Sequence, residues 1–117
     1  MQKRLILSME KLGETGDVVV KFNGEFDKAG YDEVKEELGK IVNDFNGTTL
    51  LFDLGELKFI NSEGIGYFMS VHTHLVTAGK KLVLVGPNAH VADVFNAIGI
   101  MEIMPVFNSM NDYLNKK

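Results

Sequence analysis

Two short apolar runs in the middle of the chain, each followed by a segment with helical spacing, constrain the fold most. Residues 48–54 and 81–85 are short, apolar and bounded by polar residues, which is typical of central strands covered on both faces of a sheet. Helical patterns follow both runs and reach Ala78 and Ile98. Strand–helix–strand units pair their strands in parallel through right-handed crossovers. The sequence therefore predicts an α/β fold.

The N-terminal part adds a hairpin and a helix. Residues 5–7 and the alternating residues 18–22 predict two strands around a turn at 13–16, and so short a link makes them antiparallel neighbours. We expect Asn23 and Gly24 to end the second strand. An amphipathic helix follows, and its apolar face is formed by Tyr31, Val34, Leu38, Ile41, Val42 and Phe45.

The C-terminal part predicts two more helices and one more strand. Asn88 caps a short helix that Gly99 ends. Residues 100–104 are expected to form a short edge strand, and Asn108 or Ser109 to cap a last helix.

The 117 residues are enough for one domain with an ordinary core, so we expect a single domain over residues 1–117. Its predicted order is β-β-α-β-α-β-α-β-α. This order gives a mixed five-stranded sheet that opens with an antiparallel hairpin and carries about four helices, mainly on one face.

Composition excludes several classes of function. A net charge of −4 argues against nucleic-acid binding, which needs a basic face. The absence of cysteine excludes disulfides, thiolate metal sites and a cysteine nucleophile. No segment has the ~20 apolar residues of a membrane span, and the N-terminal apolar part is too short for a signal peptide. We expect a cytoplasmic protein with no direct insertion into a membrane.

The residues that could carry catalysis do not form a recognisable site. His72 and His74 are two residues apart on one predicted helix, so they point to different faces and cannot share a metal ion. His72 falls in the apolar stripe and is expected to pack in the core. The Gly64–Gly66 segment lacks the third glycine of a dinucleotide fingerprint and the lysine of a phosphate loop. The sequence predicts no enzyme, no metal site and no cofactor.

Two carboxylates remain as candidate surface residues. Asp53 stands at the expected end of a central strand, where functional carboxylates of α/β sheets occur. The favoured interpretation is a carboxylate that accepts backbone N–H bonds. Asp27 lies just before the first predicted helix.

Residues 59–66 have the pattern of a strand-to-helix turn that presents a hydroxyl group at a helix N-terminus. Asn61 or Ser62 can cap the helix, and Glu63 places a negative charge where the helix dipole favours one. Gly64 and Gly66 remove side chains, so another surface can come close. We expect this loop to bind a partner through Phe59, Ile60, Asn61, Ser62, Glu63, Gly64, Gly66 and Tyr67.

The helix after this turn carries two apolar stripes. The predicted core stripe is Ile65, Phe68, Met69, His72, Leu75 and Val76. The second stripe is Tyr67, Val71, His74 and Ala78. The second stripe either packs against a neighbouring helix or forms a partner-binding patch beside the turn.

The order and spacing of these segments resemble the STAS domain family, the family of the bacterial anti-sigma factor antagonists. The resemblance covers nearly the whole chain: the opening hairpin, residues 24–27 before the first helix, residues 51–54 before the turn, and residues 81–86. Its most specific part is the segment 59–66.

The resemblance implies a function and a partner. In the family, an anti-sigma factor with serine kinase activity phosphorylates the Ser or Thr immediately before the first glycine of the motif Asp-Ser-Ser/Thr-Gly. The unmodified antagonist binds that partner, and the phosphorylated form does not. Here the motif reads Asn61-Ser62-Glu63-Gly64, so Glu63 occupies the acceptor position and Ser62 is the substitute hydroxyl.

Three hypotheses follow from this departure. The protein binds a regulatory partner with Ser62 as the phosphorylated switch; or Glu63 mimics the phosphorylated state in a non-switching scaffold of a signalling assembly; or the protein is the cytosolic partner of a membrane transport system. The sequence names neither the partner nor the pathway, and self-association as a homodimer stays open.

Overall fold

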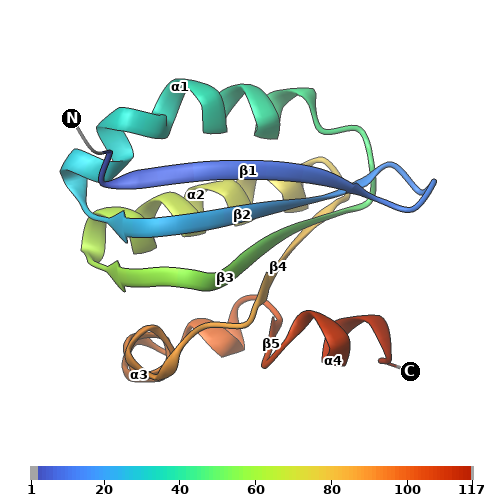
Figure 1. Cartoon of the computed structure of the whole chain (residues 1–117). Helices are drawn as coiled ribbons and strands as arrows, with labels where there is room; N and C mark the ends of the chain where they lie inside the picture. The colour runs from blue at the N-terminus through green and yellow to red at the C-terminus, as the bar shows by residue number, and fades with distance from the viewer. Residues whose placement is uncertain (1–2, 117) are drawn as a thin grey trace.

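The computed structural model describes residues 3–116 and has one sheet at its centre (Figure 1). The strand order is β1-β2-β3-β4-β5. β1 and β2 are antiparallel, and the other three pairs are parallel. The predicted mixed five-stranded sheet is therefore confirmed. Its strands are β1 (Leu5–Leu12), β2 (Asp17–Phe26), β3 (Thr49–Ile60), β4 (Lys81–Val85) and β5 (Val106–Phe107).

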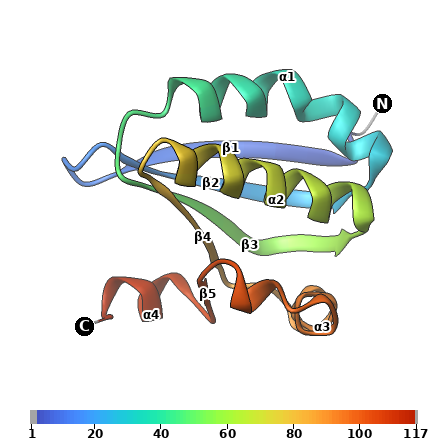
Figure 2. The ribbon, with the colours of Figure 1, turned by 180° about the vertical axis from the view of Figure 1, so that it is seen from behind.

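Most of the helices pack on one face of the sheet, as expected. The helices are α1 (Lys28–Asp44), α2 (Ser62–Thr77), α3 (Ala89–Ile98) and α4 (Met110–Leu114). Side chains of the first three join one main apolar cluster, whereas Tyr113 of α4 belongs to a smaller cluster on the other face. Seen from behind, α2 lies across the sheet with α1 beside it (Figure 2).

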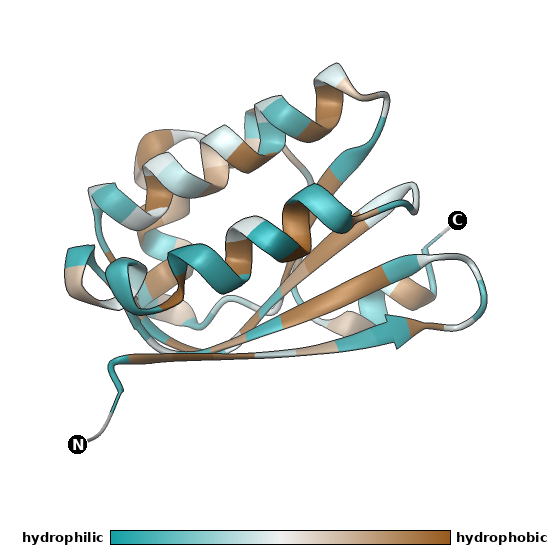
Figure 3. Cartoon of the chain, turned by 90° about the horizontal axis from the view of Figure 1, so that it is seen from above, coloured by the Kyte–Doolittle hydropathy of each residue, from teal (hydrophilic) through white to brown (hydrophobic). Residues whose placement is uncertain are grey.

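Phenylalanine side chains fill the centre of the main cluster. Phe22 lies 4.8 Å from Phe52 and 5.7 Å from Phe68 between ring centroids, and both pairs are edge-to-face. These rings are fully buried, and burial of each contributes about 1.5–3 kcal/mol. The buried apolar side chains of α1 and α2 recur at helical spacing and belong to this cluster, and hydrophobic and hydrophilic residues alternate along both helices (Figure 3).

β2 and β3 both extend beyond their predicted ends. We expected β2 to stop at Asn23 and Gly24, but it continues to Phe26, and β3 runs on to Ile60. Two irregularities in the β2–β3 register absorb the extra residues of β3, so pairing continues to the partners Phe26 and Ile60. The two strands therefore end side by side, and each leads directly into a helix.

The predicted edge strand at 100–104 is wrong. Ile100–Glu102 is a 3-10 helix, and the short fifth strand, Val106–Phe107, comes after it. Gly99 adopts a left-handed backbone conformation, with φ of 73°, and this turns the chain out of α3. Ile100 and Met104 are both buried, whereas Glu102 between them is exposed, and a strand would turn all three to the same face. The caps predicted at Asn88 and Gly99 are confirmed, and of the two candidates Asn108 and Ser109 it is Ser109 that caps the last helix.

The core stripe of α2 is rotated from its predicted position. Val71 is only 2 % exposed, whereas Val76 is 52 % exposed. His72, expected in the core, is half-buried, and its Nδ1 atom is buried without a hydrogen-bond partner. The buried stripe is Gly64, Phe68, Val71 and Leu75, a regular helical spacing that begins at a glycine rather than at an apolar side chain. Two members of the second predicted stripe, His74 and Ala78, are exposed.

Candidate functional site

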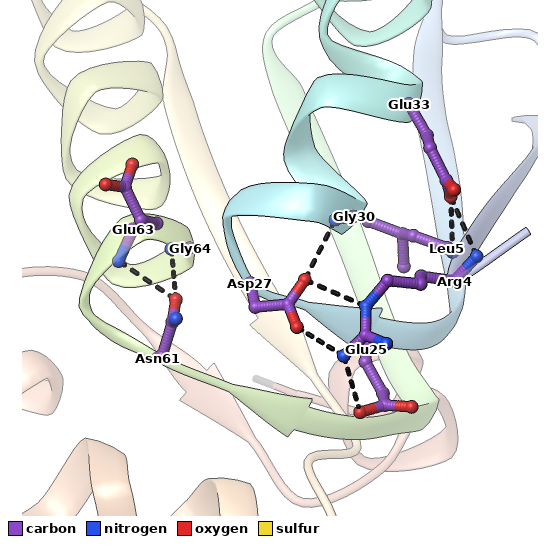
Figure 4. A network of polar contacts seen from close by, with 9 residues as sticks. All are labelled: Arg4, Leu5, Glu25, Asp27, Gly30, Glu33, Asn61, Glu63 and Gly64. Atoms are coloured by element: carbon purple, nitrogen blue, oxygen red, sulfur yellow. Dashed lines mark hydrogen bonds and ion pairs between the residues drawn. The ribbon is translucent and has the colours of Figure 1, made fainter.

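The predicted turn lies where two helices begin next to each other. Phe26 and Ile60 are parallel neighbours at the ends of β2 and β3, and the Asn61 N–H donates to the Phe26 carbonyl oxygen at 3.2 Å. α1 and α2 therefore start side by side at the C-terminal ends of β2 and β3 (Figure 4).

At the start of α2, the cap is Asn61 rather than Ser62. The Asn61 Oδ1 atom accepts from the backbone N–H of Glu63 at 3.0 Å and of Gly64 at 3.4 Å. This leaves the side chains of Ser62 and Glu63 exposed. Within residues 3–116, neither side chain makes a hydrogen bond or ion pair with another residue. Both are therefore available to a partner.

The two glycines of the turn have different surroundings. A Cβ atom on Gly64 would lie 2.6 Å from Ile60 Cγ1 and 2.9 Å from Phe26 Cδ1, so a side chain there would clash with the core. A Cβ atom on Gly66 would meet nothing within 4 Å. Gly64 lets α2 sit close to the strand ends, and Gly66 keeps the outer surface of its first turns open.

A shallow hollow of about 360 Å³ adjoins this open surface. We call it the tyrosine hollow; it is lined by Tyr31, Ser62, Glu63, Gly66, Tyr67 and Ser70. The ring centroids of Tyr31 and Tyr67 are 5.2 Å apart, and Tyr67 also packs 6.1 Å from Phe26. Burial, with a smaller contribution from Tyr31, raises the pKa of Tyr67 to about 12. Its hydroxyl group therefore stays neutral at physiological pH.

At the start of α1, the corresponding polar groups are already engaged. Asp27 caps the helix and accepts from the Gly30 N–H at 2.8 Å. The Arg4 guanidinium pairs with both carboxylate oxygens of Asp27 and, at 3.1 Å, with Glu25. The hydrogen bond from Arg4, then that from Gly30, lowers the pKa of Asp27. Glu33 accepts from the backbone N–H of Arg4 at 2.8 Å. Asp27, expected as a surface candidate, thus has a structural role in this network.

The remaining predicted residues of the turn are divided between support and surface. Ile60 is buried, as is Gly64, so these two residues position the turn. Phe59 is 37 % exposed, and its ring stacks on His90 of α3 with centroids 5.9 Å apart. Tyr67 is half-buried between the two helices. The exposed part of the turn is therefore polar, with an aromatic side chain on either side.

Asp53 is separate from this site. Its Oδ1 atom accepts from the Gly55 N–H at 3.0 Å, which confirms the expected bond to the backbone. Asp53 still pairs with Val85 of β4 and lies eight residues before Asn61 in β3, on the order of 25 Å along the strand. The structure does not bring it together with the turn.

Two properties of the described residues concern metals and membranes. Across residues 3–116, no group of three or more His, Asp and Glu side chains is arranged to hold a metal ion. In the same part of the chain, no helix is long and apolar enough to cross a bilayer.

The sequence reasoning missed several residues around the turn, above all Arg4, Gly30, Tyr31 and Ser70. A local signal for part of this set was present. Both helix starts share the pattern Asp/Asn-x-x-Gly, at Asp27 to Gly30 and at Asn61 to Gly64. Recognising the pattern twice would have placed the two starts in equivalent positions.

Comparisons with known proteins agree on one family. The STAS domain model matches residues 8–113. A relative from Bordetella bronchiseptica, named "Putative anti-sigma factor antagonist BtrV", is 31 % identical over 103 residues, which are 88 % of this chain and 86 % of that protein.

Solved structures with a similar fold include the anti-sigma factor antagonist SpoIIAA in its unphosphorylated form, with a TM-score of 0.74, 19 % identity and coverage of 94 % of each chain. The phosphorylated form of SpoIIAA, a Bacillus cell fate determinant, has a TM-score of 0.68 and 18 % identity, with coverage of 94 % of this chain and 97 % of that one. At these identities the likeness shows a shared fold.

Proposed function

This chain belongs to the STAS domain family, and from that premise we propose that it acts as an anti-sigma factor antagonist that binds its partner through the start of α2. The partner is an anti-sigma factor with serine kinase activity or a related regulatory protein. The role is one of binding, with no catalytic step in this chain.

One observation carries the proposal: the outer side of the first turns of α2 is exposed and carries two polar side chains without partners among residues 3–116. Ser62 and Glu63 make no side-chain bond within residues 3–116, and Gly66 leaves open space above the helix. A partner backbone can therefore approach closely at Gly66 while contacting both polar side chains. A polar loop held by rigid strands is a common place for binding.

The fixed charge of Glu63 distinguishes this site from a phosphorylation switch. A glutamate carries one permanent negative charge, whereas a phosphate carries about 1.5 to 2 at neutral pH. We propose that the protein binds its partner without a phosphorylation switch, and that the carboxylate of Glu63 supplies the charge at this surface. Ser62, the first residue of α2, is the position where a phosphate would add charge to the same surface.

The docking proposal is tested with a matched pair of glycine variants. Gly66→Gln adds a neutral side chain above the first turns of α2. Gly39→Gln adds the same side chain to α1, where a Cβ atom also meets nothing within 4 Å. Both changes replace a helical glycine, so both should raise stability slightly. The full chain is used to capture partners from an extract of the source organism, and the affinity of the recovered protein is then measured.

We expect Gly66→Gln to weaken partner binding by at least tenfold and Gly39→Gln to leave it unchanged. Equal affinities for the two variants would contradict docking at α2. Recovery of a membrane transport protein with the same dependence on Gly66 would support docking at the start of α2. It would overturn the assignment of an anti-sigma factor as the partner.

Phosphorylation is tested separately by measuring the intact mass of the chain after incubation with the recovered partner and ATP. A permanent charge state predicts no added phosphate. A gain of one phosphate that is lost in Ser62→Ala would instead establish Ser62 as a switch.

A further inference from the structure

The tyrosine hollow has a chemistry that points to one kind of occupant. Its lining side chains supply two phenol groups, two serine hydroxyls and one carboxylate, and none of them is Lys, Arg or His. Every polar side-chain atom in the lining is therefore an oxygen, and each can accept a hydrogen bond. Because Tyr67 stays neutral, Glu63 is the charged group of this lining.

The charge of Glu63 has no counterion within residues 3–116. The cations of the neighbouring segments hold other carboxylates: Lys28 and Lys35 both pair with Asp32, at 3.5 and 3.8 Å, and Arg4 is held in the network at the start of α1. Glu63 lies apart from that network (Figure 4). None of these neighbouring cations therefore serves as a counterion for Glu63. An occupant of the hollow can supply that positive charge.

The aromatic rings of the hollow add a second requirement. Tyr31 and Tyr67 are inclined at 45° with centroids 5.2 Å apart, and Tyr67 rests against Phe26. Both tyrosines are half-buried, so the rings are held in place before a partner arrives. A cation is attracted to the face of such a ring. A guanidinium group also stacks flat on the ring and offers five N–H donors to surrounding oxygens, which an ammonium group cannot do.

We propose that the tyrosine hollow receives an arginine side chain of the partner protein, which stacks on Tyr31 and Tyr67 and pairs with the Glu63 carboxylate. The inference rests on the proposed function, because it names the partner chemistry at the same surface. It also gives Glu63 an active role, since its permanent charge selects a partner with a basic docking face.

The test uses a small probe, so that it does not depend on identifying the partner. The full isotope-labelled chain is titrated with N-acetyl-arginine amide and, in parallel, with N-acetyl-citrulline amide, which has nearly the same shape but no charge. Nuclear magnetic resonance follows the ring signals of Tyr31 and Tyr67 and the amide signals of 62–67 at constant ionic strength. We expect the arginine probe to bind at least fivefold more tightly than the citrulline probe, with shifts confined to the hollow.

Variants separate the charge from the rings. Glu63→Gln should weaken binding of the arginine probe about fivefold to tenfold, whereas Glu37→Gln, the same change at an exposed position of α1, should have no effect. Tyr31→Leu should weaken binding about threefold to fivefold, and Tyr31→Phe should restore most of it because the ring remains. Equal binding of the two probes, or unchanged binding in Glu63→Gln, would overturn the inference.

The two proposals fail in different ways. If Gly66→Gln abolishes partner binding but the two probes bind equally, docking at α2 stands and the arginine assignment is wrong. If the arginine probe binds selectively but Gly66→Gln retains the partner at full affinity, the hollow is a cation site that the partner does not use. That result overturns both the docking proposal and the assignment of the arginine to the partner.

Discussion

Two helices of this protein begin side by side with the same backbone and different side chains. Asp27 caps α1 with φ of −114° and ψ of −170°, and Asn61 caps α2 with φ of −117° and ψ of −169°. In both helices a buried glycine follows three residues after the cap, Gly30 in α1 and Gly64 in α2. The chain thus uses one local solution twice to turn from a parallel strand into a helix.

The polar groups at the two starts differ in what they are free to do. At α1 the capping carboxylate is held by Arg4, which also binds Glu25. At α2 the cap is a neutral amide, and the side chains of Ser62 and Glu63 remain free within residues 3–116. Nearly identical backbone geometry therefore engages the polar side chains at one helix start and leaves them exposed at the next.

The glycines that follow the caps should give the largest effects on stability. A Cβ atom on Gly30 would run into the Glu25 carbonyl oxygen, and one on Gly64 would press on Ile60 and Phe26. The nearest atom to the new Cβ is a backbone oxygen at Gly30 and a side-chain carbon, which yields more easily, at Gly64, so we expect Gly30→Ala to cost about 3 kcal/mol and Gly64→Ala about 2 kcal/mol. Chemical denaturation measures both. A cost below about 0.5 kcal/mol at either glycine would mean that the two starts are not built alike.

The caps themselves should have the next largest effects. Replacing a capping side chain by alanine costs about 0.5–2 kcal/mol. We expect Asp27→Ala to lie near the upper end, because it also releases Arg4, and Asn61→Ala to cost about 1 kcal/mol. The free energies of unfolding of the two variants decide the order. A larger loss for Asn61→Ala would show that the cap of α2 contributes more to the free energy of unfolding than the cap of α1.

The charge at Asp27 should make the two starts differ in their response to acid. Its pKa is lowered in the folded state, so the carboxylate contributes stability above its ordinary pKa of about 4. That contribution disappears as the pH falls through the lower folded-state value. We expect the stability of the parent to fall more steeply below about pH 4 than that of Asp27→Asn. Denaturation curves over a pH series test this, and parallel pH profiles would contradict it.

The smallest effect is expected at the glycine that is not needed for packing. Gly66 has open space around it, so Gly66→Ala should stabilise α2 by about 0.5–1 kcal/mol. Gly39→Ala should behave alike in α1 for the same reason. Thermal unfolding of the two variants checks the sign. A destabilised Gly66→Ala would indicate that the surface of α2 is more tightly packed than the structure indicates.

Much of the fold could be predicted from periodicity and from the caps. Apolar runs placed the central strands, and Asn88, Gly99 and Ser109 marked the ends of helices as predicted. The continuity of β3 from the apolar run at 48–54 to Ile60 could not be read from the sequence, because the polar residues between them are accommodated by register shifts against β2. The 3-10 helix after Gly99 was missed for a similar reason: a short apolar segment fits a strand or a turn equally well.

The site was predicted only in its local part. Asn61, Ser62 and Glu63 are close in sequence, and their cap and exposure follow from their residue types. Tyr31 comes from another helix, and its place beside Tyr67 depends on how α1 and α2 pack. Asp27 was recognised as a candidate without the reason for its position, since its partner Arg4 is 23 residues away. Long-range contacts of this kind have no signal in one sequence.

The central claim is that the start of α2 binds the partner while the start of α1 serves stability. Hydrogen–deuterium exchange of the full chain, with and without the recovered partner, tests it most directly. We expect the partner to slow exchange most in residues 62–67, with no change in 4–6 or 25–28. Protection centred on 4–6 and 25–28, with 62–67 unaffected, would contradict it.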